Sequence, residues 1–156
     1  MGVISTTLLA ALAALLIAAA IGDLRARTIP NMLNAAVALL ALPWWWAAGV
    51  PLWPDIAMQV TAALALLLLF GAVFAFGGMG GGDVKLIVAL ALWLPVAALG
   101  EMLVVMALAG GVLTILMLGW HRWRRAEGRP EIPYGVAIVA AGLWVVANDL
   151  LTIPGS

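Results

Sequence analysis

Two aspartates, Asp23 and Asp83, are the residues of this chain whose type and setting could support catalysis. Each stands where an apolar stretch meets a polar segment, so each is expected at a membrane boundary. Two carboxylates that share a site of low dielectric constant do not easily both ionise, and one of them keeps its proton. Such a pair titrates as a unit and can hold a water molecule. One carboxylate then acts as general base on the water while the protonated partner polarises a peptide carbonyl.

The chain contains few residues that could support other kinds of catalysis. The chain has no cysteine, which excludes disulfides, iron–sulfur clusters and cysteine zinc sites. His121 lies in a basic run without a metal-ligand companion at helical spacing, so we interpret it as a solvated loop residue. Ser5 and Ser156 are the only serines, both near the termini, and a serine nucleophile is not expected. We therefore predict that no metal and no cofactor is needed.

The composition places the chain in a membrane. Of its 156 residues, 67% are hydrophobic and 9% are charged, whereas soluble domains are about 45–50% apolar and about 25% charged. This difference predicts an integral membrane protein, with residues 1–156 forming a single membrane-embedded domain whose partner is the lipid bilayer. The length is too small for a membrane domain plus a second folded domain of ordinary size. No nucleic-acid partner is expected.

Six apolar stretches predict an all-α, polytopic protein with about six transmembrane helices. They cover residues 1–22, 31–49, 56–76, 83–95, 102–120 and 133–150. The first is predicted to be a retained helix, because no Lys or Arg precedes its Ala18-Ala19-Ala20 end as in a secretory signal. Trp44, Trp45 and Trp46, near the far end of the second, are predicted at the membrane interface.

The fourth stretch is short for a membrane-spanning helix. The 15 uncharged residues between Lys85 and Glu101 cover about 22 Å as a helix, against roughly 30 Å of hydrocarbon. Three explanations stay open at this point. The helix is short, the bilayer thins locally, or Asp83 and Lys85 lie partly inside the membrane.

The charges give the predicted topology. All seven basic residues fall in the connections after the first, third and fifth stretches: Arg25, Arg27, Lys85, Arg122, Arg124, Arg125 and Arg129. The opposite side carries only acidic side chains: Asp55, Glu101 and Asp149. By the positive-inside rule the basic connections are cytoplasmic and the N-terminus is outside. Asp23 and Asp83 then share the cytoplasmic face. Residues 121–131 are interpreted as a loop that sets this topology rather than as a binding patch.

A glycine-rich segment, residues 77–85, delivers the chain to the second aspartate. Five of its nine residues are glycine, and each glycine costs a helix roughly 1 kcal/mol relative to alanine. We therefore predict that the segment is not helical and that Asp83 and Lys85 lie in a wet recess lined by protein. The alternative is a flexible cytoplasmic turn in which Asp83 caps the next helix.

Three segments resemble motifs of the type IV prepilin peptidases, which are intramembrane aspartyl proteases. Gly80-Gly81-Gly82-Asp83 fits their Gly-x-Gly-Asp signature, with Met79 before it and Val84-Lys85 after it. Residues 23–31, Asp-Leu-Arg-Ala-Arg-Thr-Ile-Pro-Asn, resemble the first aspartate motif, an Asp followed by a basic residue and Ile-Pro-Asn. Residues 132–137 resemble a third segment, usually Pro-Tyr-Gly-Pro-Ala, from which Val136 departs. The resemblance spans nearly the whole chain, in the right order.

The resemblance implies that Asp23 and Asp83 are catalytic and that nearby residues bind substrate or support the site: Gly80, Gly82, Lys85, Arg27, Pro30, Asn31, Pro133, Tyr134 and Gly135. For Lys85, a role in orienting substrate and a role as an interfacial lysine that reaches outward both stay open. Residues 133–135 either line the site or simply begin a helix with an interfacial aromatic. The glycines would let an extended substrate backbone approach closely.

The resemblance also implies the substrate and the place of action. The substrate would be a prepilin or pseudopilin precursor, anchored by a hydrophobic N-terminal helix, whose short basic leader is removed at the cytoplasmic side of the bacterial inner membrane. Long members of the family carry a segment with paired cysteines and methylate the new pilin N-terminus. This cysteine-free chain resembles the short form found with tight-adherence (Flp-type) pilus systems, so we expect cleavage without methylation.

Two competing hypotheses remain at this stage. A small polytopic transporter could use Asp23 and Asp83 for ion coupling, although that leaves the Ile-Pro-Asn and Pro-Tyr-Gly segments unexplained. An inactive peptidase homologue that acts in pilus assembly is the other, and the presence of both aspartates speaks against it. Ion flux without cleavage of any prepilin would favour the transporter.

Overall fold

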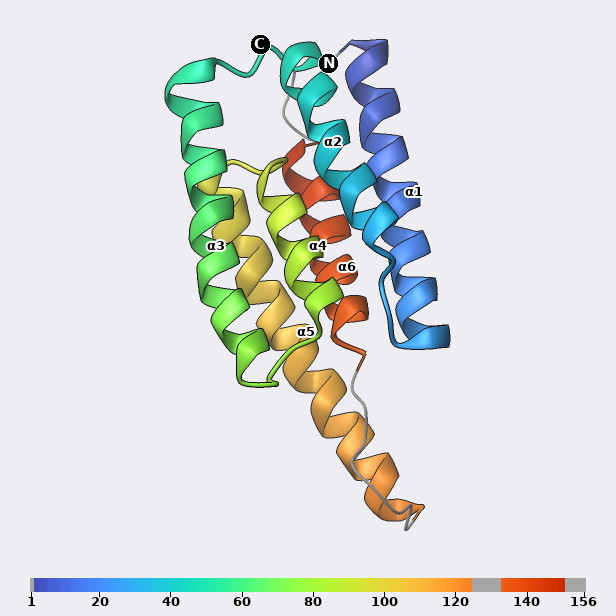
Figure 1. The fold of residues 1–156 in the computed structure, drawn as a ribbon. Coiled ribbons are helices and arrows are strands. Elements are labelled where there is room, and N and C mark those ends of the chain that lie inside the picture. Colours follow the sequence, from blue (N-terminus) through green and yellow to red (C-terminus); the bar gives the residue numbers. More distant parts are fainter. Residues whose placement is uncertain (1, 125–132, 151–156) are drawn as a thin grey trace.

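The structure, a computed structural model, describes residues 2–124 and 133–150, with side chains up to Asn148 (Figure 1). In these ranges the chain is helical apart from short connections, and no strand occurs. The predicted all-α fold is confirmed. The basic segment from 125 to 132, with Arg125, Glu127, Arg129 and Glu131, lies outside the described residues, as does the side chain of Asp149.

Within residues 2–124 and 133–150, six α-helices and two π-helical turns follow one another. In order they are α1 (Val3–Ala26), α2 (Asn31–Ala47), η1 (Leu52–Ile56), α3 (Ala57–Ala75), α4 (Gly81–Ala91), α5 (Val96–Trp123), α6 (Tyr134–Val145) and η2 (Val146–Leu150). Within the described residues, three stretches are long and apolar enough to cross a membrane: Val3–Ala26, Leu52–Ala75 and Val96–Trp123. The chain is therefore an integral membrane protein.

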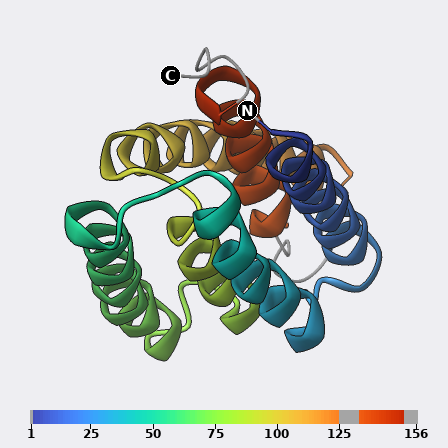
Figure 2. The same cartoon turned by 90° about the horizontal axis from the view of Figure 1, so that it is seen from above.

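The short helix α4 lies at the centre of the bundle. It packs against α2, α3 and α6, while α1 packs against α2 and α6 and α5 packs against α6 (Figure 2). Most of its side chains are buried, among them Leu86, Ile87 and Leu90, each with no exposed surface. Its 11 residues cover about 16 Å. The short fourth apolar stretch is thus explained by a short helix, the first of the three explanations given above.

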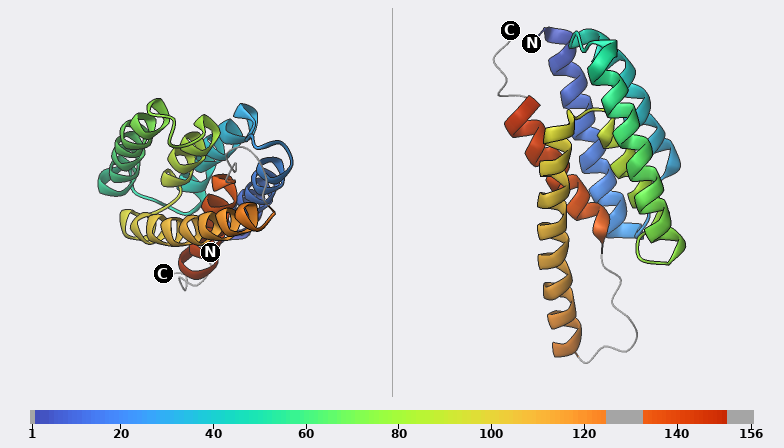
Figure 3. Two further views of the ribbon diagram at one scale, coloured as in Figure 1. Left: turned by 90° about the horizontal axis from the view of Figure 1, so that it is seen from below. Right: turned by 90° about the vertical axis from the view of Figure 1, so that its left-hand side faces the viewer.

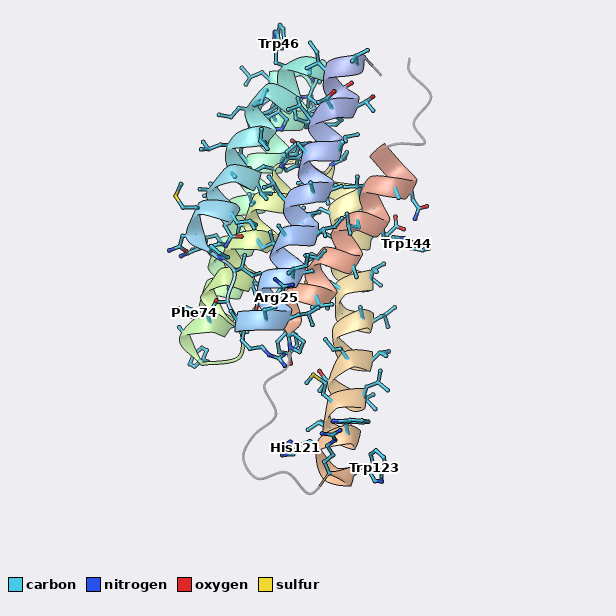
Figure 4. The ribbon with its side chains drawn as sticks, turned by 90° about the vertical axis from the view of Figure 1, so that its right-hand side faces the viewer. Arg25, Trp46, Phe74, His121, Trp123 and Trp144 are labelled. Atoms are coloured by element: carbon cyan, nitrogen blue, oxygen red, sulfur yellow. The ribbon has the colours of Figure 1, made fainter. Side chains whose placement is uncertain are left out.

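Tryptophans join the C-terminal end of α4 to α2 in the core. Trp93 is fully buried, stacks on Trp44 at a centroid distance of 5.6 Å and donates a hydrogen bond to the carbonyl of Val37 at 2.9 Å. Trp44 is therefore covered by protein, and the location of the Trp44–Trp46 run at the membrane interface stays a prediction. Trp46, which is exposed, points outward at the end of α2 (Figure 4). Neighbouring helical side chains diverge by about 100°, so three consecutive indoles cannot share one environment.

The glycine-rich segment is only partly irregular. Residues 77–80 form a turn, with Gly77 at a left-handed φ of 73°, but α4 begins at Gly81. The prediction of a non-helical segment is thus wrong for residues 81–85. Glycine is tolerated at these positions because the N–H groups of the first helical turn have no intrahelical acceptor, so few helical hydrogen bonds depend on the glycines.

Helix α5 is longer than predicted and extends beyond the bundle. Its 28 residues cover about 42 Å, and its C-terminal end continues past the ends of the other helices (Figures 1 and 3). His121 therefore lies in the last turn of α5 rather than in a loop. Trp120 and Trp123 meet edge to face nearby, and the Arg124 guanidinium lies 4.5 Å from the Trp120 ring centroid. Such aromatic and basic side chains suit a membrane interface.

Candidate active site

Asp23 is buried in the last turns of α1. Its side chain is 5% exposed, and the helix continues past it to Ala26. Arg27 then adopts a left-handed conformation with φ 54°, and its backbone N–H donates to the carbonyl of Asp23 at 2.9 Å. The prediction placed Asp23 just after the first helix, whereas the structure places it inside. The helix end that follows fixes its backbone.

Asp83 is buried in the first turn of α4. Its side chain is 8% exposed, and its carboxylate folds back toward the backbone N–H of Gly80, the residue before the helix. This is the reach of an acidic side chain at the third helical position in a capping box. The alternative interpretation, in which Asp83 caps the next helix, therefore holds in part, because the carboxylate accepts from a backbone N–H group at the start of α4. Glycine at position 80 leaves room for it, since a Cβ there would lie 3.0 Å from Oδ2 of Asp83.

The two carboxylates come from different helices and are close enough to interact electrostatically. Helix α6 joins them, because it packs against both α1 and α4. Gly135, at its start, lies directly on Asp23: a Cβ at position 135 would be 2.8 Å from Cγ and Oδ2 of that carboxylate. The backbone N–H groups of Gly135 and Val136 also face Asp23. Position 135 therefore has no room for a side chain.

Gly82 brings α4 against the connection between α1 and α2. A Cβ at this position would lie 3.2 Å from the Cβ and the carbonyl oxygen of Ile29, whose side chain is buried. Backbone atoms cannot move aside as a flexible side chain can. The glycine therefore allows the close approach that brings the start of α4, and Asp83 with it, toward the end of α1.

Asn34 is a site-supporting residue that the motif-based prediction missed. Its side chain is 4% exposed, and its Nδ2 donates a hydrogen bond of 3.1 Å to the carbonyl of Gly82. Because Gly82 precedes Asp83, this bond links α2 to the start of α4 beside the second aspartate. The sequence contains a usable signal for it, since Asn34 is an isolated amide in the apolar run from Met32 to Trp46.

Lys85 ties α4 to α2 on the outside of the site. Its Nζ donates to Oδ1 of Asn31 at 2.7 Å, and both residues are exposed. Lys85 follows Asp83 by two positions, which turns its side chain about 200° around the helix axis and away from the Asp83 carboxylate.

Pro30 is the exposed residue that precedes α2. Arg27 is also exposed but lies within electrostatic range of Asp23.

The third predicted segment contributes in different ways. Pro133 is buried and precedes α6, and Gly135 lies against Asp23. Tyr134 is half-buried and lines an apolar groove with Met79, the residue before Gly80. The structure thus brings the start of α6 and the glycine-rich segment together around the two aspartates.

The carboxylate pair has the features needed for acid–base chemistry. Oδ2 of Asp23 and Oδ1 of Asn34 are buried oxygens without a hydrogen-bond partner in the part of the chain that the structure describes. A buried acceptor of this kind is available to a hydrogen donor such as water. No group of three or more His, Cys, Asp or Glu side chains that could hold a metal ion occurs among the described residues.

The fold and this site define a polytopic helical membrane protein with a buried pair of carboxylates near one end of its helices. Comparison with known proteins identifies the family. Residues 10–117 match the type IV leader peptidase family, so the chain belongs to that family. No solved structure matches the chain.

Two curated relatives show the extent of the similarity. The prepilin leader peptidase/N-methyltransferase of Xanthomonas campestris pv. campestris is 30% identical over 146 residues, which cover 83% of this chain and 46% of the relative. The protein of the same description from Neisseria gonorrhoeae is 42% identical over 74 residues, covering 46% of this chain and 23% of the relative. The chain thus spans less than half the length of the curated relatives it matches.

Proposed function

We propose that this protein is an intramembrane aspartic endopeptidase that removes the short leader of prepilins or pseudopilins. Family membership supports a prepilin peptidase role. The observation that carries the aspartic mechanism is the pairing of Asp23 and Asp83, two buried carboxylates from separate helices within electrostatic range of each other. Burying two ionised carboxylates together is costly, and the cost falls when the pair shares one proton.

In the proposed mechanism, a water molecule binds between the two carboxylates. The ionised carboxylate takes a proton from the water as its oxygen attacks the scissile carbonyl carbon, and the protonated carboxyl group donates a hydrogen bond to the carbonyl oxygen. Collapse of the tetrahedral intermediate breaks the C–N bond, and the leaving amine takes up a proton from the pair. Gly135 and Gly80 give the carboxylates the room to meet, and Asn34 fixes the start of α4.

The proposed active site faces the cytoplasm in the bacterial inner membrane. Arg25 lies at the end of the molecule opposite Trp46, and His121 lies further out at that same end (Figure 4). The basic residues that the structure describes lie in or beside the helix ends that face this side: Arg25, Arg27, Lys85, Arg122 and Arg124. This distribution supports a cytoplasmic location under the positive-inside rule. A leader on the cytoplasmic side of a precursor would then meet the carboxylates directly.

We further propose that these residues cleave without methyl transfer. The resemblance to the short, peptidase-only form and the absence of cysteine from the 156 residues support this proposal. Incubation of the purified protein with a mature pilin and labelled S-adenosylmethionine tests it. No label should be transferred, and labelled pilin would contradict the proposal.

Co-expression with a prepilin from the same genome tests the proposed function. Removal of the leader, followed by gel shift and by mass spectrometry of the product, is expected with the wild-type protein. Asp23→Asn and Asp83→Asn keep the side-chain size but remove the ionisable group, so both should abolish cleavage. Glu101→Gln is the matched control, because Glu101 is an exposed acid on α5. Failure of the wild-type protein to cleave any of several prepilins would contradict the proposal.

A further inference from the structure

An apolar groove of about 480 Å³ lies between α5 and the start of α6. Its lining includes Met79, Gly110, Gly111, Thr114, Tyr134 and Ile138. The hydroxyl of Thr114 is already committed, because it donates to the carbonyl of Gly110 within the same helix at 2.7 Å. The groove therefore offers an apolar surface with little demand for polar partners.

The groove adjoins both aspartates through neighbours in the chain. Tyr134 lines it and is followed by Gly135, which lies on the carboxylate of Asp23. Met79 lines it and is followed by Gly80, which lies on the carboxylate of Asp83. Each of the two groove residues is therefore the chain neighbour of a glycine that contacts a carboxylate, so a molecule bound in the groove lies beside the carboxylate pair.

The chemistry of the groove restricts what can occupy it. An apolar lining at membrane depth excludes a segment with unpaired backbone groups, so a chain bound there must be an apolar helix. Gly110 and Gly111 remove side chains from the α5 wall, and small residues of this kind let two membrane helices approach closely. Gly111 is exposed, and no atom lies within 4 Å of the position its Cβ would take.

The exposed face of α5 continues beyond the groove. Ile115 and Leu118 follow Gly111 by four and seven positions, which places them on the same face of α5. Both side chains are exposed where the helix leaves the bundle (Figure 3). A helix seated against Gly111 can therefore follow α5 for about two further turns.

We propose that this groove is the docking site for the apolar helix of the precursor, with α5 as the docking helix and Gly111 at the closest contact. The inference rests on the proposed function. Continuity with the carboxylate pair favours a substrate helix over a lipid chain or a second copy of this protein, because only a substrate must end beside Asp23 and Asp83.

Filling the groove tests this proposal by activity. Gly111→Leu places a large side chain in the groove without a clash in the free protein, and we expect it to lower the rate of prepilin cleavage at least about tenfold, mainly through a higher KM. Gly100→Leu is the matched control, because Gly100 is also an exposed α5 glycine with no atom within 4 Å of a Cβ, but it lies outside the groove. The control should cleave at the wild-type rate.

Cysteine cross-linking gives a second readout that needs no catalysis. The chain has no cysteine of its own, so Gly111→Cys and Gly100→Cys can each be combined with Asp83→Asn and with a prepilin carrying one cysteine in its apolar helix. A cross-link from position 111 and none from position 100 is expected. Equal cross-linking at both positions, or a cross-link between two copies of this protein at 111, would overturn the docking site.

The outcomes separate the two proposals. Wild-type cleavage with an unchanged Gly111→Leu rate would reject the groove and leave the proposed function intact. Absence of cleavage by the wild-type protein would reject the proposed function itself.

Discussion

Gly135 lies so close to Asp23 that a methyl group at position 135 would be 2.8 Å from Cγ of the carboxylate. The two residues are 112 positions apart in the chain (135 − 23) and belong to α6 and α1. Real Cβ atoms do not approach other heavy atoms to this distance. The contact therefore determines where α6 can lie and where the Asp23 carboxylate can point.

Gly135→Ala should consequently disrupt the site. The methyl group must displace either the carboxylate or the start of α6, at a cost of about 1–3 kcal/mol for overpacking. We expect prepilin cleavage to fall at least about a hundredfold, because a small misplacement of a catalytic group has effects of this size. Gly100→Ala is the control, since nothing lies near its Cβ position, and it should cleave normally. Normal cleavage by Gly135→Ala would contradict the account of this contact.

Asn34→Ala should weaken the start of α4. The substitution removes the hydrogen bond that Nδ2 of Asn34 donates to the carbonyl of Gly82, and a hydrogen bond of this kind contributes about 0.5–1.5 kcal/mol. We expect a lower Tm in detergent and slower cleavage, with Asn34→Gln restoring neither fully because its amide is displaced by one methylene. Asn148→Ala, an exposed amide, should match the wild-type protein. An unchanged Tm and rate in Asn34→Ala would show that the bond does not position Asp83.

Lys85→Met should have a small effect. The lysine is exposed and donates a hydrogen bond to Asn31. A typical hydrogen bond contributes about 0.5–1.5 kcal/mol, so we expect cleavage to slow less than about tenfold. Asn31→Ala removes the same bond and should behave alike. If Lys85→Met lost cleavage while Asn31→Ala kept it, Lys85 would be shown to contact the substrate.

Cleavage should decline at alkaline pH. The mechanism requires one proton on the Asp23–Asp83 pair, and raising the pH removes that proton, so the rate must fall once the pair is fully ionised. The initial rate in liposomes over a series of buffers measures this, with circular dichroism confirming that the helices stay folded. A rate that kept rising well above neutral pH would contradict a shared proton.

The fold could be predicted from the sequence as far as local patterns determine it. Apolar runs interrupted by Pro30, Pro95 and the glycine-rich segment predict the helices, because proline and glycine break the periodic pattern. The end of α1 was placed too early since Asp23 and Arg25 are polar, yet the helix continues to Ala26. Helical propensity of residues such as Leu24 and Ala26 outweighs the polarity there.

The pairing of Asp23 with Asp83 could be predicted, whereas the contacts that support it could not. Topology alone places both aspartates at one end of the bundle. The approach of Gly135 to Asp23 and the bond from Asn34 to Gly82 depend on how helices distant in sequence pack. No local pattern encodes those distances.

The kinetics of single and double aspartate variants test the central claim most directly. Cleavage of a purified prepilin in liposomes would be measured for the wild-type protein, Asp23→Asn, Asp83→Asn and the double variant. Residues that act as one catalytic unit are not additive, so each single variant should lose at least about a thousandfold in kcat and the double variant should be no slower. Either single variant retaining activity within tenfold of wild type would contradict the proposed carboxylate pair.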